Sequence, residues 1–202
     1  LPIAVWNATW GVEEIEKLFT LAKGYYPVTP EGNPVSDLVL DIESLNAAVA
    51  RLYSEDLAVS LDFAGDVHQR WQAEYRAGQL INSALLLTAR LQDGTRLLRQ
   101  RIDGRPLCLN GKPNNQSDIV QNMFFSVYIE KIQPYMSAVT QGRVALIEPF
   151  ERLAAVQQEV MPESFTGWYE RHLSQDAEAS LWRELDVAMM AHTRAWQELL
   201  GQ

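Results

Sequence analysis

Apolar residues recur at spacings of three and four along most of the chain, and this helical period dominates the hydrophobic pattern. Alternation of apolar and polar residues, which is typical of strands, is nearly absent. The pattern therefore predicts an all-α protein. At 202 residues, of which 47% are hydrophobic, the chain has the size and composition of one globular unit. We expect a single helical domain over residues 1–202, a bundle of about six or seven helices.

Capping and helix-breaking residues bound the periodic segments. The expected helices run over residues 12–23, 37–53, 57–102, 117–140, 143–160, 164–172 and 174–201, the third starting near Leu57 or near Asp66. Asp93 and Gly94 interrupt the third segment. Either the helix passes through them, at about 1 kcal/mol for the glycine, or it ends there and residues 95–109 form a hairpin. The continuous helix is favoured because the apolar register is the same on both sides.

The segment 117–140 is apolar on nearly all of its sides and carries only a narrow polar stripe. A helix of this kind is expected at the centre of a bundle. We therefore expect Phe125 and Ile132 to be fully buried. Pro134 lacks the N–H that would reach the carbonyl of Glu130, which predicts a kink at that position.

Two segments differ from their surroundings in composition. The stretch 25–36 begins YYPVTP and is rich in proline, so we expect an exposed irregular loop, with Tyr25 and Tyr26 as candidate binding residues. The stretch 90–112 carries six basic residues against two acidic ones, a local charge of +4. Its arginines either solvate the flanks of an apolar helix or form a patch for a protein or another anionic surface. The candidate binding residues of this basic segment are Arg96, Arg99, Arg101 and Arg105.

The formal net charge of -9 disfavours nucleic acid as a partner, because affinity for phosphate backbones comes mainly from Lys and Arg. No apolar run approaches the roughly 18 residues that a membrane-spanning helix needs. The single cysteine, Cys108, excludes an internal disulfide and a multi-cysteine metal site. Glu-x-x-His pairs, P-loops and the G-x-S-x-G motif are absent from the sequence. We therefore predict no catalytic residues, no metal site and no cofactor.

Aromatic residues and one histidine complete the candidates. Trp71, Tyr128 and Trp196 either line a ligand pocket between helices or pack in the core. His192 shares the apolar stripe of the last helix, so we expect it to be buried as a neutral, hydrogen-bonded imidazole. Desolvation then predicts a pKa below the unfolded value of about 6.5. Metal binding by His192 would need partners from distant segments.

Three stretches carry a resemblance to a known family: WNATWG at 6–11, NMFFSVYIEKIQPYM at 122–136 and HTRAWQELL at 192–200. Together they resemble an uncharacterised family of gammaproteobacterial envelope proteins, predicted lipoproteins described only as a domain of unknown function. The resemblance implies an upstream region with an export signal and a lipid-anchoring cysteine. The chain begins at Leu1 rather than Met, which indicates a processed or excised chain. We therefore expect a location in the cell envelope or periplasm.

The expected function is that of a non-enzymatic, envelope-associated binding or scaffolding protein. Its partner surface would include either the proline-rich loop 25–36 or the basic segment 90–112. The alternative is a helical small-molecule-binding protein with an aromatic pocket, and an enzyme of unrecognised type comes third. A cavity above about 300 Å³ lined by Trp71, Tyr128 or Trp196 would favour the small-molecule binder, whereas a filled core with an exposed apolar patch would favour the partner-binding protein.

Overall fold

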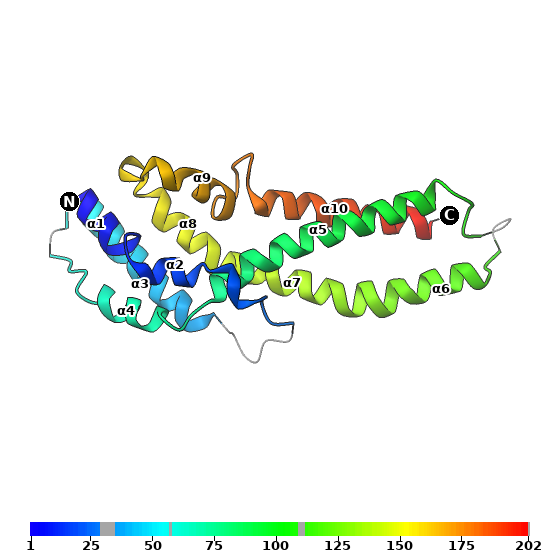
Figure 1. Cartoon of the computed structure of the whole chain (residues 1–202), viewed down its shortest axis with the longest axis horizontal. Coiled ribbons are helices and arrows are strands. Elements are labelled where there is room, and N and C mark those ends of the chain that lie inside the picture. The colour runs from blue at the N-terminus through cyan, green and yellow to red at the C-terminus, as the bar shows by residue number, and fades with distance from the viewer. Residues whose placement is uncertain (29–34, 57, 109–111, 202) are drawn as a thin grey trace.

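The computed structural model describes residues 1–28, 35–56, 58–108 and 112–201. These residues form helices and no strand, which confirms the all-α class. The molecule is elongated, with the N-terminus at one end and the C-terminus near the other (Figure 1). The α-helices are α1 Pro2–Thr9, α2 Glu13–Leu18, α3 Ser36–Tyr53, α4 Ala64–Trp71, α5 Arg76–Ile102, α6 Asn115–Met123, α7 Gln133–Gly142, α8 Glu148–Ala155, α9 Glu163–His172 and α10 Leu181–Leu200. Short 3₁₀ turns η1 Leu21–Lys23 and η4 Gln158–Val160 and the π-helical segments η2 Phe124–Ile132 and η3 Arg143–Ile147 complete them.

One end of the molecule, which we call the base, contains α1–α4, α8 and α9 (Figure 1). Aromatic side chains hold it together. The ring of Phe150 on α8 is fully buried and contacts Trp10, Phe19 and Trp71 at centroid distances of 5.9, 5.1 and 5.6 Å. Trp6 stacks on Trp10 in turn, at 6.1 Å. Trp6 on α1 and Trp10 directly after it therefore anchor the helix in the aromatic core of the base.

The other part, which we call the arm, consists of α5, α10 and the run α6–η2–α7 (Figure 1). Helices α5 and α10 pack side by side over most of their length. Helix α5 passes through Asp93 and Gly94 without a break, so the expectation of a continuous helix is confirmed and the hairpin alternative is wrong.

A single helical run extends from Asn115 to Ala155 through α6, η2, α7, η3 and α8. The predicted division into helices over 117–140 and 143–160 is therefore wrong. Pro134 and Pro149 lie in the first turns of α7 and α8, and a π-helical segment precedes each of these helices. Proline inside a regular helix removes a hydrogen bond and clashes with the carbonyl four residues before it. The change to π-helical hydrogen bonding upstream alters this pairing, so the chain continues past both prolines.

Two helices begin at other residues than the sequence pattern indicated. The helix expected to begin at residue 117 begins at Asn115, capped by Asn114, whose side chain accepts hydrogen bonds from the N–H groups of Gln116 and Ser117. Ser180, rather than Ser174, caps α10. Each of these segments offers several good N-cap residues, so local preference alone does not select one.

The burial expected for Phe125 and Ile132 is wrong. Phe125 is 50% exposed and Ile132 is only half-buried. Among the residues of α6 and η2, only Tyr128 is buried. This part of the run lies along one side of the arm, while α5 and α10 form the central pair. In this segment, the apolar residues on one side pack against the arm. Those on other sides, which include Ile119, Met123 and Val127, are exposed.

Phe150 and Phe125 give opposite expectations for truncation. We expect Phe150→Ala to lower the free energy of unfolding by roughly 3 to 5 kcal/mol, because it removes a fully buried ring and leaves a cavity. We expect Phe125→Ala to cost less than about 1 kcal/mol, because the ring is half in water already. Urea denaturation of the two variants measures both. Equal losses would contradict the peripheral position of η2.

Candidate functional site

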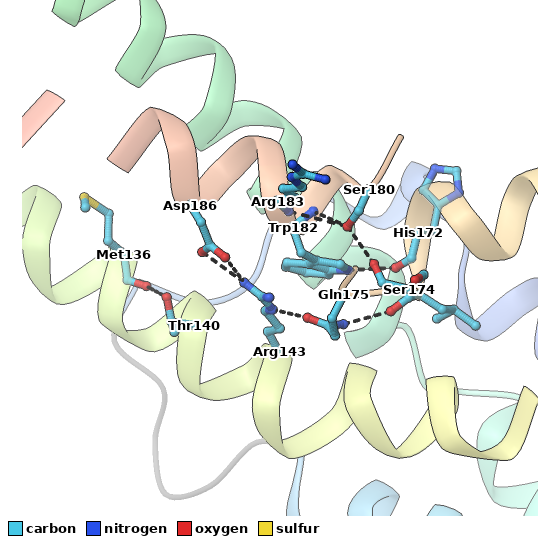
Figure 2. Close-up of polar contacts among 11 residues, drawn as sticks. Met136, Thr140, Arg143, His172, Ser174, Gln175, Ser180, Trp182, Arg183 and Asp186 are labelled. Atoms are coloured by element: carbon cyan, nitrogen blue, oxygen red, sulfur yellow. Dashed lines mark hydrogen bonds and ion pairs between the residues drawn. The ribbon is translucent and has the colours of Figure 1, made fainter. Parts of the chain in front are cut away.

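Most of the predicted site residues lie on the arm. The position of the arm is fixed at the junction where it meets the base. Figure 2 shows this junction, centred on Arg143 at the start of η3. Its Nη1 donates to both carboxylate oxygens of Asp186 on α10, each at 3.0 Å, and its Nε donates to Gln175. The guanidinium also lies over the ring of Trp182, 5.5 Å from the ring centroid. All of these contacts hold α10 against η3.

Sequence reasoning missed Arg143. The only signal was its position as a single charge in the apolar stretch VTQGRVALI, and its partners come from 32 and 43 residues away. The Arg143 side chain is only 14% exposed, and its Nε and Nη1 are engaged within the molecule. The junction is therefore a structural ion pair that fixes η3 to α10 and to the segment that precedes α10.

His192 lies at the centre of the arm, between α5, η2 and α10. It is 8% exposed, and its Nε2 accepts a hydrogen bond from Trp196 Nε1–H at 3.0 Å. Nε2 must therefore be unprotonated, which places the proton of the neutral ring on Nδ1, 3.2 Å from Thr95 Oγ1. Burial lowers the pKa of His192, although a hydrogen bond to the backbone of Leu91 opposes this shift. The expected burial and the expected direction of the pKa shift are both confirmed.

The position of His192 also explains why a glycine occupies position 94 in α5. A Cβ atom at this position would lie 2.8 Å from His192 Cε1, which is closer than two non-bonded carbon atoms approach in proteins. The glycine inside α5 therefore makes room for the imidazole ring. On its other side, His192 meets the ring of Tyr128 edge-on, with the centroids 5.1 Å apart. Tyr128 is hydrogen-bonded to Thr193 at 2.8 Å, and this contact connects η2 to α10.

The structure divides the basic segment into paired and unpaired residues. Arg96 donates to Asp93 at 2.6 Å, and Arg99 forms an ion pair with Glu198 that joins α5 to α10. Arg101 donates to the backbone carbonyl of Arg105. The Arg105 and Lys112 side chains are exposed and have no ion pair within the described residues. Arg96 and Arg99 therefore serve the fold, while the basic groups nearest the end of the arm are available.

Apolar side chains are exposed at the same end of the arm, where α5 and α10 end and α6 begins (Figure 1). Leu97 is 64%, Ile119 59%, Phe125 50% and Leu200 38% exposed. We call this surface the arm end, and its members are Leu97, Arg101, Arg105, Lys112, Ile119, Phe125 and Leu200. It combines basic and apolar groups with two exposed carboxylates nearby, Asp103 and Asp118.

The remaining candidates lie elsewhere or are packed. Trp71 is buried in the base, and Trp196 stacks on Tyr128 in the arm with ring centroids 5.9 Å apart. The N–H of Tyr26 donates to Ser83 Oγ at 2.8 Å, so this residue is fixed against α5, whereas Tyr25 is 51% exposed. Residues 25–28 are irregular, as predicted, and 29–34 lie outside the described residues.

A groove of about 360 Å³ opens on the surface between α10 and α7. Its lining residues are Met136, Met189, Met190, Thr193, Arg194 and Gln197. In the described ranges, no group of three or more His, Cys, Asp or Glu side chains is arranged to hold a metal ion. None of the described helices has the length and apolar character needed to cross a membrane.

The whole chain, residues 1–202, matches a family described as "Protein of unknown function (DUF3080)". No curated protein matches the chain, and no solved structure matches it.

Acid should destabilise the protein. Burial lowers the pKa of His68, His172 and His192, so the unfolded chain binds protons at a higher pH than the folded chain does. Below the unfolded value of about 6.5, protonation therefore favours the unfolded state, and the loss continues until the folded pKa is reached. We expect the free energy of unfolding to fall between pH 7.5 and pH 5.5, and to fall less in His192→Gln. Urea unfolding across this range measures the difference, and an equal loss in both proteins would contradict the assignment.

Gly94 and His192 should be coupled. We expect Gly94→Ala to destabilise the protein by about 1 to 3 kcal/mol, because the new methyl group overlaps the imidazole. In the His192→Ala background the same change should be neutral or stabilising by up to about 1 kcal/mol, since alanine is the better helix former. A double-mutant cycle by urea denaturation measures this coupling. Identical effects in both backgrounds would show that the ring does not require the glycine.

Proposed function

The chain belongs to the DUF3080 family, and we propose that it is a non-enzymatic binding or scaffolding protein of the cell envelope. The observation that carries this proposal is the arm end, where the exposed basic side chains of Arg105 and Lys112 and the half-buried Arg101 lie at the same end of the arm as exposed apolar side chains. The partner we propose is an anionic surface that presents phosphate groups, such as the head groups of envelope lipids. Part of the proposal is the gammaproteobacterial lipoprotein origin that the sequence resemblance implies.

The distribution of charge supports this partner. The chain as a whole carries -9, whereas its basic segment carries +4, so the remainder is more acidic than the average. An anionic surface would attract the arm end and repel the base. Because charges act over about 8 Å at physiological salt, this orients the elongated molecule only once it is close to the surface.

The apolar members of the arm end support it as well. Side chains such as Leu97 and Phe125, exposed beside arginine and lysine, resemble the pattern with which peripheral proteins enter the boundary between head groups and acyl chains. Each basic residue near an anionic bilayer contributes on the order of 1 kcal/mol, so three of them give weak and reversible binding. A covalent lipid anchor, as the resemblance implies, would supply the second attachment.

Burial weighs against the alternative function. The aromatic residues proposed to line a pocket, Trp71, Tyr128 and Trp196, are each at most 5% exposed. Their rings contact other side chains directly. This packing favours partner binding over a small-molecule pocket between these rings. No observation favours an enzyme.

Vesicle flotation tests the proposal. We expect the protein to float with vesicles of phosphatidylglycerol and phosphatidylethanolamine but not with phosphatidylcholine alone. Arg101→Gln/Arg105→Gln should weaken this binding by about tenfold or more, because two contacts to phosphate are lost. The same variant should change the free energy of unfolding by less than about 0.5 kcal/mol.

The matched control removes the same charge from elsewhere. Lys23→Gln/Arg183→Gln lowers the net charge equally, and both residues are exposed far from the arm end. We expect this variant to bind the anionic vesicles as the parent does. Equal weakening by both variants would reduce the effect to net charge, and the arm end would then not be the contact surface.

A further inference from the structure

We propose that the groove between α10 and α7 binds an amphipathic helix of a protein partner that carries acidic side chains beside its apolar face. This proposal rests on other residues than the arm end and is independent of binding to an anionic surface. It starts from the six lining residues named above, from Met136 on α7 to Gln197 on α10.

The shape of the groove suits a helix. Helix α10 runs from the base toward the arm end, and the run α6–η2–α7 returns in the opposite direction (Figure 1). A third helix can pack along two antiparallel helices, as in a bundle. Hydrogen bonds join α10 to the segments that flank α7, Asp186 to Arg143 of η3 and Thr193 to Tyr128 of η2. The groove therefore exists before a partner arrives, which lowers the cost of binding.

The lining is apolar and adaptable. Met136 is buried, so Met189 and Met190 contribute the accessible flexible, polarizable side chains, which fit different apolar surfaces. Met190 is 60% exposed, and Val187, one turn earlier on the same face of α10, is 56% exposed. Apolar surface that remains in water here would be buried by the apolar face of a docked helix.

Charge selects the kind of helix. Arg194 is the only charged residue among those that line the groove. Its side chain is exposed and makes no ion pair or hydrogen bond with the described residues. No carboxylate lines the groove, so an incoming acidic side chain meets a cation and no like charge. A second copy of this chain is a poorer occupant, because each copy carries a net charge of -9.

The five methionines provide the experiment. Methyl NMR of methionine-labelled full chain reports the groove through Met136, Met189 and Met190, while Met123 and Met161 serve as internal controls. The probe is a synthetic helical peptide with leucines at spacings of three and four and glutamates beside them. Its matched control carries lysines in place of the glutamates. We expect the glutamate peptide to shift the three groove methyls, and to bind about tenfold more tightly than the lysine peptide.

Charge reversal is the decisive variant. Arg194→Glu should invert the preference, so that the lysine peptide binds more tightly. Met190→Gln should weaken both peptides, because it removes apolar contact without adding charge, and since the side chain is exposed the variant should remain folded by circular dichroism. Arg101→Gln/Arg105→Gln should bind the glutamate peptide as the parent does, which separates this site from the arm end.

Three outcomes would overturn the proposal. The first is shifts of equal size at Met123 and Met161, which would show binding without a site. The second is an unchanged preference in Arg194→Glu. The third is broadening of the groove methyls with increasing protein concentration and no peptide, which would assign the groove to contact between copies.

Discussion

The contact between His192 and Gly94 determines how the two longest helices meet. A side chain at position 94 would hold α10 away from α5, because its Cβ would overlap the imidazole ring. With glycine there, the ring lies directly on the backbone of α5, and its two nitrogens are satisfied by Thr95 and Trp196. Close approach of α5 and α10 also brings Arg99 within reach of Glu198. The remaining helix of the arm is placed against this pair.

That third part, η2 with its neighbours, rests on the pair through aromatic side chains. Phe124 and Tyr128 pack on Trp196 with ring centroids 5.2 and 5.9 Å apart, and Tyr128 also meets His192. These large rings lie between η2 and α10, and only one face of η2 takes part in this packing. The opposite face, and the surface between α10 and α7, consequently stay open. Exposed apolar residues in the arm follow from this mode of packing.

Periodicity in the sequence was sufficient for the helical class, for α3, for the continuity of α5 and for the burial of His192, because each depends on residues close together in the chain. It failed for Phe125, since period alone does not say how many faces of an apolar helix find a neighbour. Arg143 was missed because its structural role depends on an ion pair with Asp186, which lies 43 residues away in the sequence. The sequence also could not show that Arg99 has an ion pair and Arg105 has none, because only the fold brings Glu198 close to Arg99.

The chain contains 26 acidic residues against 17 basic ones, so carboxylates are in excess over arginine and lysine. In such a chain a basic side chain without an ion pair does not reflect a shortage of partners. Arg96, Arg99 and Arg143, which connect or border helices, all have carboxylates. Arg105 and Arg194 have none among the described residues, and both stand beside exposed apolar side chains. The two surfaces proposed for binding therefore share one feature, a cation without an ion pair near apolar side chains that remain in water.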